Sequence, residues 1–150
     1  MNFDNVNDIL EFAMEQEQGA VDFYLDLAKK SNNKEMKAVF EAFAHEEVGH
    51  KARLKEIQHT QINDLETENI SDLKVSDYVV KAKPHENMTY EEALVLAMNK
   101  EKAAFKLYST LAERINNPEL KKVFQALAIE ESKHKLRFEL EYDDYVMREN

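Results

Sequence analysis

The sequence of 150 residues contains no cysteine. A chain without thiols forms no disulfide bond and cannot bind a metal ion through thiolates, which excludes iron–sulfur clusters and rubredoxin-type iron. Any metal ion that this protein binds must therefore be held by nitrogen and oxygen atoms.

Glycine and proline are also scarce, with two residues of each. Sheets use these residues in their turns, whereas alanine, leucine, glutamate and lysine, which are abundant here, favour long helices. We therefore predict an all-α fold. The length fits a single domain over residues 1–150 with one core.

An excess of positive charge and long apolar runs are lacking as well. The net charge is −10 and the isoelectric point is near 5.0, so no surplus of Lys or Arg is available to bind nucleic acid or an anionic membrane surface. No apolar run approaches the roughly 18 residues of a membrane span, and Met1–Asp8 does not resemble a signal peptide. We expect a cytoplasmic protein that binds neither nucleic acid nor membranes.

Four amphipathic segments are predicted to be helices, because their apolar residues recur at three- and four-residue steps. Typical helix-start signals support them. Thr89 and Glu92 form a capping box, and Asn33 and Asn117 stand where the second and fourth segments begin. The predicted helices cover about 6–30, 34–59 and 90–115, and a fourth begins at 118 and takes up the residues after His134.

The segment between the two pairs, about 61–88, is far longer than a tight turn between antiparallel neighbours requires. It is mixed, polar and only weakly periodic. We therefore predict a ferritin-like four-helix bundle, in which two antiparallel helix hairpins are joined by this long crossover.

The second pair of helices repeats the first. Leu10–Leu54 aligned without a gap on Leu94–Phe138 matches at 21 of 45 positions, and the repeat extends over about 6–58 and 90–142. A repeat that preserved only a hydrophobic core would not need to keep carboxylates and imidazoles on the apolar faces of its helices. The matched polar residues therefore indicate a polar centre shared by the two helix pairs. The matched polar residues are Glu17 with Glu101, Glu47 with Glu131, His50 with His134, and Tyr24 with Tyr108.

The candidate ligands share one level of the predicted hairpins. Glu17 and Glu47 are both about 22 Å along the helix axis from the turn between their helices. Glu101 and Glu131 are at the same distance from the turn of the second pair. Buried carboxylates at one level repel each other or take up protons unless cations neutralise them, and two divalent ions balance four acids. One imidazole per metal suits iron or manganese, with zinc not excluded. The predicted dimetal ligands are Glu17, Glu47, His50, Glu101, Glu131 and His134.

A single Glu-x-x-His pair is weak evidence in a chain this rich in glutamate. Glu56 and His59 have the same spacing, but the repeat does not support them, and we interpret them as surface residues together with His45 and His85. Glu46 and Glu130 remain the rivals of Glu47 and Glu131, because an i,i+4 spacing also places a carboxylate on the face of the histidine.

The chain resembles the rubrerythrins of the ferritin-like superfamily over nearly all of residues 6–142. The resemblance rests on Glu17 with Tyr24, on Glu101 with Tyr108, and on the segments FAHEEVGH at 43–50 and AIEESKH at 128–134. It implies a diiron centre in which Glu47 and Glu131 bridge the metals while the other four ligands complete the ends. Tyr24 and Tyr108 would either hydrogen-bond ligand carboxylates or serve as aromatic core.

The resemblance implies an oxidoreductase that reacts with hydrogen peroxide or dioxygen, as in a response to oxidative stress. Rubrerythrins typically carry a further carboxylate three residues after the glutamate of the third helix, whereas this chain has Ala104 there and Ala20 at the matching position of the first helix. They also usually carry a rubredoxin-like domain, which needs cysteine. We therefore expect a separate electron donor, such as a rubredoxin-like protein.

Two other functions remain open from the sequence. The centre could oxidise and sequester iron as a ferroxidase or iron-binding ferritin-like protein without peroxidase turnover, or the metals could only hold the helices together. A homo-oligomer, most simply a dimer, is also expected, formed through exposed apolar faces or by exchange of helices between chains.

Overall fold

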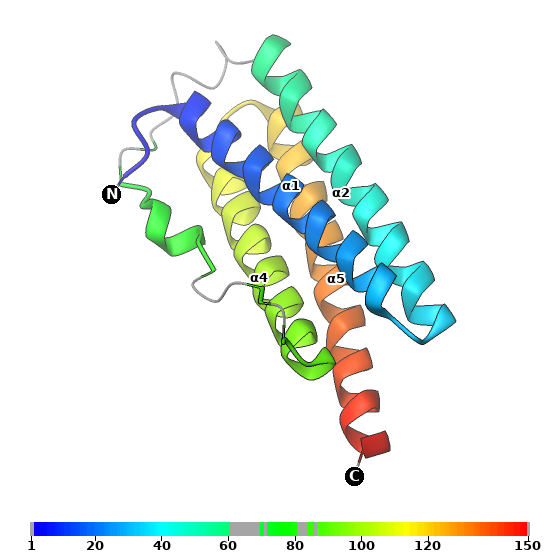
Figure 1. Ribbon diagram of the computed structural model, residues 1–150. Coiled ribbons are helices and arrows are strands. Elements are labelled where there is room, and N and C mark those ends of the chain that lie inside the picture. The colour runs from blue at the N-terminus through cyan, green and yellow to red at the C-terminus, as the bar shows by residue number, and fades with distance from the viewer. Residues whose placement is uncertain (1, 61–69, 71, 81–83, 86, 150) are drawn as a thin grey trace. The chain divides into compact units, whose positions relative to one another are not determined.

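The computed structural model in Figure 1 describes residues 2–60, 70, 72–80, 84, 85 and 87–149. Its helices are α1 (Val6–Lys30), α2 (Lys34–Thr60), the 3-10 helix η1 (Val75–Tyr78), α4 (Tyr90–Arg114) and α5 (Pro118–Glu149). Within these described residues no strand longer than an isolated bridge occurs. The chain forms two compact units, Met1–Leu73 and Lys74–Asn150.

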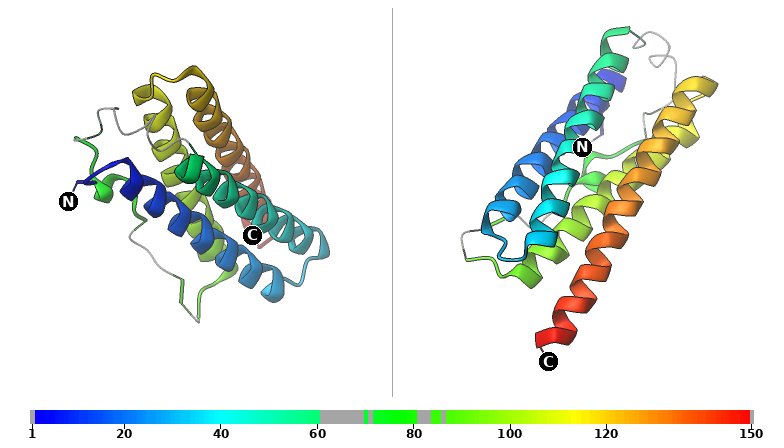
Figure 2. Two further views of the ribbon diagram at one scale, coloured as in Figure 1. Left: turned by 90° about the horizontal axis from the view of Figure 1, so that it is seen from above. Right: turned by 90° about the vertical axis from the view of Figure 1, so that its right-hand side faces the viewer.

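The first unit is the α1–α2 hairpin, whose helices run antiparallel side by side (Figures 1 and 2). Asn5 caps α1, because its Oδ1 accepts the N–H of Asp8 at 2.9 Å. Asn33 starts α2 in the same way, accepting the N–H of Met36 at 3.1 Å. These caps satisfy N–H groups that have no partner inside a helix. The buried apolar residues include Ile9, Leu10, Ala13, Tyr24, Met36, Phe40, Leu54 and Ile57.

The second unit contains the α4–α5 hairpin, which has the same antiparallel form (Figure 2). The predicted capping box is present: Thr89 accepts the N–H of Glu92 at 3.1 Å, and the Glu92 side chain returns to Thr89. Asn117 Oδ1 accepts the N–H of Leu120 at 3.2 Å at the start of α5. The buried apolar residues include Leu94, Ala97, Leu107, Tyr108, Leu111, Leu120, Phe124, Leu127 and Phe138.

The predicted crossover at about 61–88 lies partly outside the described residues, which omit 61–69, 71, 81–83 and 86. In its described parts Ile70, Leu73 and Tyr78 are buried, and the Phe3 N–H donates to the Leu73 carbonyl at 3.3 Å. These contacts hold parts of the segment on the surface of their own units. The single domain over 1–150 stays a prediction.

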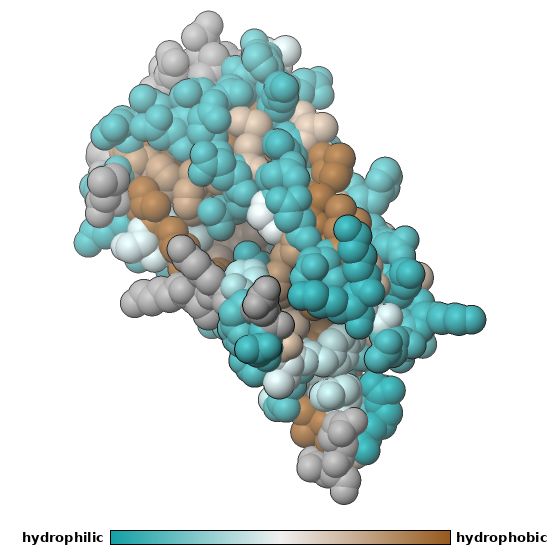
Figure 3. Space-filling view, in the orientation of Figure 1, coloured by the Kyte–Doolittle hydropathy of each residue, from teal (hydrophilic) through white to brown (hydrophobic). Residues whose placement is uncertain are grey.

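Helix bounds agree with the sequence prediction to within a residue for α1, α2 and α4. Helix α5 continues past the end of the repeat to Glu149, as expected for residues that finish the fourth helix. None of the described helices has an apolar stretch long enough to cross a membrane. On the face drawn in Figure 3 hydrophilic residues predominate, and hydrophobic residues surface in scattered patches.

Candidate metal centre

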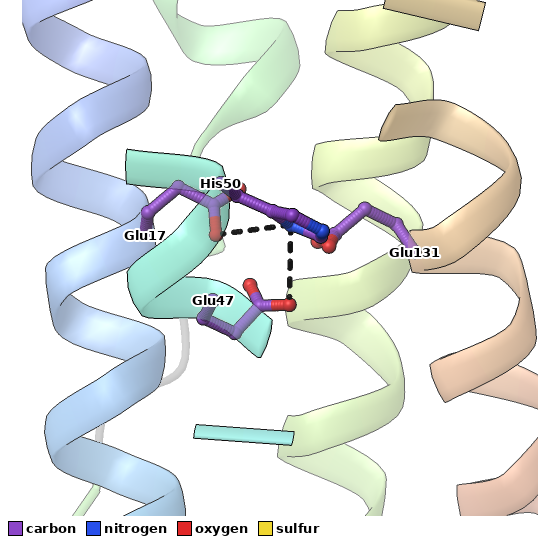
Figure 4. A group of neighbouring side chains, drawn as sticks. All are labelled: Glu17, Glu47, His50 and Glu131. Carbon is purple, nitrogen blue, oxygen red and sulfur yellow. Dashed lines mark ion pairs between the residues drawn. The ribbon is translucent and has the colours of Figure 1, made fainter. Parts of the chain in front are cut away.

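In the first hairpin, three of the predicted ligands lie together. Glu17 comes from α1, and Glu47 and His50 come from α2 (Figure 4). His50 Nδ1 is 3.6 Å from Glu17 Oε2 and 3.5 Å from Glu47 Oε1. All three residues are buried, with exposed fractions of 2%, 1% and 5%. We call this set the first ligand cluster.

The positions of these residues on their helices explain why they meet. Glu17 follows Ala13 and Met14 at the four- and three-residue steps that keep side chains on one helix face, and both are buried. His50 follows Glu47 by three residues on α2, so the two side chains are neighbours one turn apart. The acidic and imidazole groups therefore lie on the buried, mostly apolar faces of α1 and α2.

The second hairpin repeats this cluster with Glu101 from α4 and Glu131 and His134 from α5. His134 Nδ1 is 3.6 Å from Glu101 Oε1, and the exposed fractions of the three residues are 1%, 1% and 3%. In each cluster, one donor atom from every residue lies within 4.8 Å of the other two. We call this set the second ligand cluster. The 84-residue repeat is therefore a repeat of three-dimensional sets of buried acids and imidazoles as well as of sequence.

The charges within each cluster favour either a bound cation or protonation of a carboxylate. Burial penalises an ionised carboxylate strongly, and two carboxylates this close also repel each other. A protonated imidazole would neutralise only one of the two negative charges. A divalent ion neutralises both and leaves the imidazole neutral, which is the form that binds metals.

The distances in the clusters also fit metal binding. The separations of 3.5 and 3.6 Å exceed those of an N–H···O hydrogen bond, about 2.7–3.2 Å. Two donor atoms at about 2.1 Å from one ion are about 3.0 Å apart at octahedral angles and about 3.4 Å apart at tetrahedral angles. The observed separations are close to these values. The residues present therefore fit a divalent ion in each cluster, and their role as ligands stays a prediction.

The rival residues lie elsewhere. Glu46 is exposed and Glu130 is half-buried, in contrast to the fully buried Glu47 and Glu131. The residues interpreted as surface are indeed exposed: His45, Glu56, His59 and His85.

Both tyrosines that match in the repeat are buried. Tyr24 has an exposed fraction of 0% and Tyr108 one of 1%. Tyr108 stacks on Phe124 with ring centroids 6.3 Å apart, and Tyr24 meets Phe23 edge-on at 5.9 Å. Aromatic packing is therefore part of their role, and a hydrogen bond to a ligand remains a prediction.

Next to Glu101, the ammonium group of Lys100 is half-buried. Its burial lowers the pKa of Lys100, and the Glu101 carboxylate opposes that shift. The position of the extra rubrerythrin carboxylate holds Ala104, which is half-buried, and its match Ala20 is buried. Neither methyl group can act as a ligand.

The sequence analysis missed one buried acid. Glu141 of α5 has an exposed fraction of 5% and accepts a hydrogen bond from the Tyr90 hydroxyl at 2.9 Å. Arg148 lies 3.6 Å from the same carboxylate oxygen, Oε2. Burial, with the bond to Glu141, raises the pKa of the Tyr90 hydroxyl. The signal was present in the sequence, because Glu141 follows Phe138 by three residues and therefore continues its buried face.

Comparisons with known proteins agree with this description. The protein is similar to a solved structure from Thermotoga maritima described as a ferritin-like diiron-carboxylate protein, with a TM-score of 0.83 and 20% sequence identity over 97% of this chain and 99% of that one. The all-α, ferritin-like fold class predicted from the sequence is therefore confirmed. No curated protein matches the sequence. The sequence model of the Rubrerythrin family matches residues 8–142. This protein therefore belongs to the Rubrerythrin family.

Proposed function

We propose that the two ligand clusters together form one dimetal centre that most simply holds iron, with manganese or zinc as other occupants. The observation that carries the proposal is the presence of the same buried Glu, Glu, His set at matched positions of both hairpins. Family membership supports it, and so does the description of the T. maritima protein as a diiron-carboxylate protein. In this proposal Glu47 and Glu131 would hold both ions, and Glu17, His50, Glu101 and His134 would complete the ligand set.

The reaction we propose is the two-electron reduction of hydrogen peroxide or dioxygen. A bound pair of ferrous ions would supply two electrons, which with two protons would convert one hydrogen peroxide to two waters or one dioxygen to hydrogen peroxide. A separate donor, such as a rubredoxin-like protein, must then return the electrons. The chain itself contains no cysteine with which to hold a rubredoxin-type iron.

The chain's own residues hold and isolate the centre. The carboxylates would balance the charge of the ions, and the neutral imidazoles would bind them without adding further charge. Tyr24 and Tyr108 act as positioning residues that fix carboxylate orientation within the buried core. Tyr24→Phe and Tyr108→Phe are therefore expected to retain bound metal but to slow the peroxide reaction by about 10-fold. Unchanged rates in both variants would leave only the packing role.

A second candidate function is iron oxidation and sequestration without sustained peroxidase turnover. The observation that favours it is the alanine at both positions where a further carboxylate would be needed, Ala20 and Ala104. A centre without that carboxylate can still oxidise Fe(II). It lacks the additional ligand to which, in typical rubrerythrins, an iron ion moves when its oxidation state changes.

The experiment compares anaerobic reconstitution with Fe(II) in three proteins. They are the natural chain, a Glu47→Ala, Glu131→Ala variant that lacks the proposed bridges, and a Glu46→Ala, Glu130→Ala control that removes the neighbouring repeat-matched acids. Metal content and the ultraviolet–visible spectrum are recorded before and after one equivalent of peroxide, and again with air. The natural chain and the control are expected to bind a pair of irons per chain and to develop a ferric absorption band.

The outcomes separate the functions. Repeated peroxide consumption with a chemical reductant supports the oxidoreductase. Iron uptake well beyond a pair per chain, without such turnover, supports sequestration. A natural chain that binds no more iron than the Glu47→Ala, Glu131→Ala variant would contradict both, and the repeat would then reflect only a duplicated helical hairpin.

A further inference from the structure

The outer face of α5 carries a row of exposed apolar side chains. Ile129, Leu136, Leu140 and Met147 have exposed fractions of 53%, 56%, 55% and 76%. At about 100° per residue they lie within about 20° of one straight line along the helix and span about 27 Å. We call these four residues the α5 stripe. Single exposed apolar residues are ordinary, but an aligned row along one helix marks an interaction surface.

The internal repeat provides a control for this feature. The α2 positions that match Ile129, Leu136 and Leu140 hold His45, Ala52 and Glu56, all exposed. The same place on the first hairpin therefore has an ordinary polar surface. Only one of the two hairpins carries the row at these matched positions, so neither the hairpin fold nor the repeat requires it.

We propose that the α5 stripe is the interface of a symmetric homodimer, in which α5 of a second copy packs antiparallel against it. The spacing of the stripe is symmetric about position 138. Leu136 and Leu140 lie two residues on either side, and Ile129 and Met147 lie nine residues on either side. An antiparallel two-fold pairing centred there places Leu136 against Leu140 of the partner subunit and Ile129 against Met147 of the partner subunit.

Charge decides between antiparallel and parallel pairing. Lys133 and Asp143 are exposed and lie five residues on either side of position 138. They flank the α5 stripe at about 40° on opposite sides. Antiparallel pairing therefore brings Lys133 of each copy next to Asp143 of the other, twice by symmetry. Parallel pairing would instead place the two Lys133 side chains of the dimer next to each other, and likewise the two Asp143 side chains. The repulsion between these like charges disfavours parallel pairing.

Residues farther from the α5 stripe do not disturb this arrangement. Arg137 and Glu139 lie about 80° from it, at the edge of the interface, where long side chains reach water. Glu139 also forms an ion pair with Lys135 of its own helix. The fully buried centre of the interface is thus apolar, with opposite charges beside it, as in stable protein interfaces.

The interface is separate from the proposed metal ligands. Glu131 and His134 lie about 140–160° around α5 from the stripe. Substitutions on the stripe should therefore leave iron content unchanged, and a loss of dimerisation can be distinguished from a failure of the proposed dimetal centre or of folding.

The first test is sedimentation velocity of the full, metal-loaded chain over a dilution series. We expect a monomer–dimer equilibrium in the natural chain and a monomer at every concentration for Leu136→Glu, Leu140→Glu. The matched control is Leu25→Glu, which alters an exposed leucine of α1 (43% exposed) and should still dimerise. Helical circular dichroism and iron content should be unchanged in both variants. A natural chain that stays monomeric, or a stripe variant that dimerises normally, overturns the proposal.

A charge exchange then tests the antiparallel direction. Lys133→Asp and Asp143→Lys should each raise the dimer dissociation constant by about 10-fold. The double variant, which swaps the charges, should recover the natural affinity, and mixing the two single variants should produce heterodimers. Failure of both forms of rescue would contradict antiparallel pairing of α5.

Discussion

The α1–α2 and α4–α5 hairpins match at 21 of 45 aligned positions, and comparison of the two shows which parts of each must stay the same. Both hold two buried glutamates and a buried histidine at matched places. On the outside they differ, because α5 carries an apolar stripe where α2 has His45, Ala52 and Glu56. The inner faces have kept one chemistry, while the outer faces were free to acquire separate roles.

A second difference lies at the ends of the hairpins. The half-buried Tyr90 and the buried Glu141, which are hydrogen-bonded in the second hairpin, correspond in the repeat to Val6 and Ile57 of the first, which are buried apolar residues. The same position is thus filled by a hydrogen-bonded polar pair in one hairpin and by aliphatic side chains in the other. Buried space in this fold tolerates polar groups where they have partners.

The largest expected effect concerns the ligand clusters, which the proposed centre makes equivalent. Glu17→Ala and Glu101→Ala should each lower metal affinity by roughly 100-fold or more, because each removes a coordinating carboxylate. Isothermal titration with Fe(II) under anaerobic conditions measures this loss. A large loss of metal affinity from the substitution in one hairpin, with no loss from the other, would show that the two clusters are not equivalent.

Metal removal should reduce stability by about 3–4 kcal/mol when the free metal is at 100 to 1,000 times its dissociation constant. The cause is the repulsion of buried carboxylates in both clusters once no cation balances them. Denaturant unfolding with and without metal measures the difference. The Glu47→Ala, Glu131→Ala variant should show little of this dependence, and an equally large one there would place the stabilising metal elsewhere.

A smaller effect is expected from the Tyr90 and Glu141 pair. Tyr90→Phe should destabilise the protein by about 1–3 kcal/mol, because a buried carboxylate loses its hydrogen-bond donor. The matched control introduces the residues that the first hairpin has at these positions, as the double variant Tyr90→Val, Glu141→Ile. This variant should lose less free energy of unfolding than Tyr90→Phe, because no buried carboxylate is left without its partner. Guanidinium unfolding compares the two. A double variant less stable than Tyr90→Phe would contradict this view of the pair.

The smallest expected effect is on the pH dependence of stability. The pKa of Tyr90 is raised in the folded protein, so the hydroxyl keeps its proton while the unfolded chain loses it near pH 10. The stability from this group is therefore complete below about pH 10 and is lost as the pH rises from there towards the folded pKa. Unfolding midpoints of the natural chain should fall more steeply above pH 10 than those of Tyr90→Phe. Parallel curves would exclude this linkage.

Much of the fold and the candidate centre could be predicted because local signals agreed with the repeat. The Thr89 capping box and the Asn33 and Asn117 caps are local chemistry, and each is present. The choice between Glu47 and Glu46 as the candidate ligand could not rest on spacing alone, because either residue could lie on the same helix face as His50. The complete burial of Glu47, against the exposure of Glu46, comes only from the structure.

Hydrophobicity alone is misleading at two neighbouring positions of α5. Leu140 is apolar but 55% exposed, and Glu141, which the sequence analysis overlooked, is buried. Residues two apart on a helix point in nearly opposite directions, so Phe138 and Leu140 cannot share a face, whereas Phe138 and Glu141 do. Hydrophobicity favoured the leucine, and helical geometry places the glutamate inside.

The central claim is that the two ligand clusters hold one coupled pair of ions and not two separate ones. The most direct measurement is the electron paramagnetic resonance spectrum, with Mössbauer spectroscopy in an applied field, of the iron-loaded protein after oxidation. Ferric ions joined by Glu47 and Glu131 should couple antiferromagnetically, giving a diamagnetic ground state and no high-spin ferric resonance. A strong resonance from isolated high-spin ferric ions, at full iron content, would contradict the account.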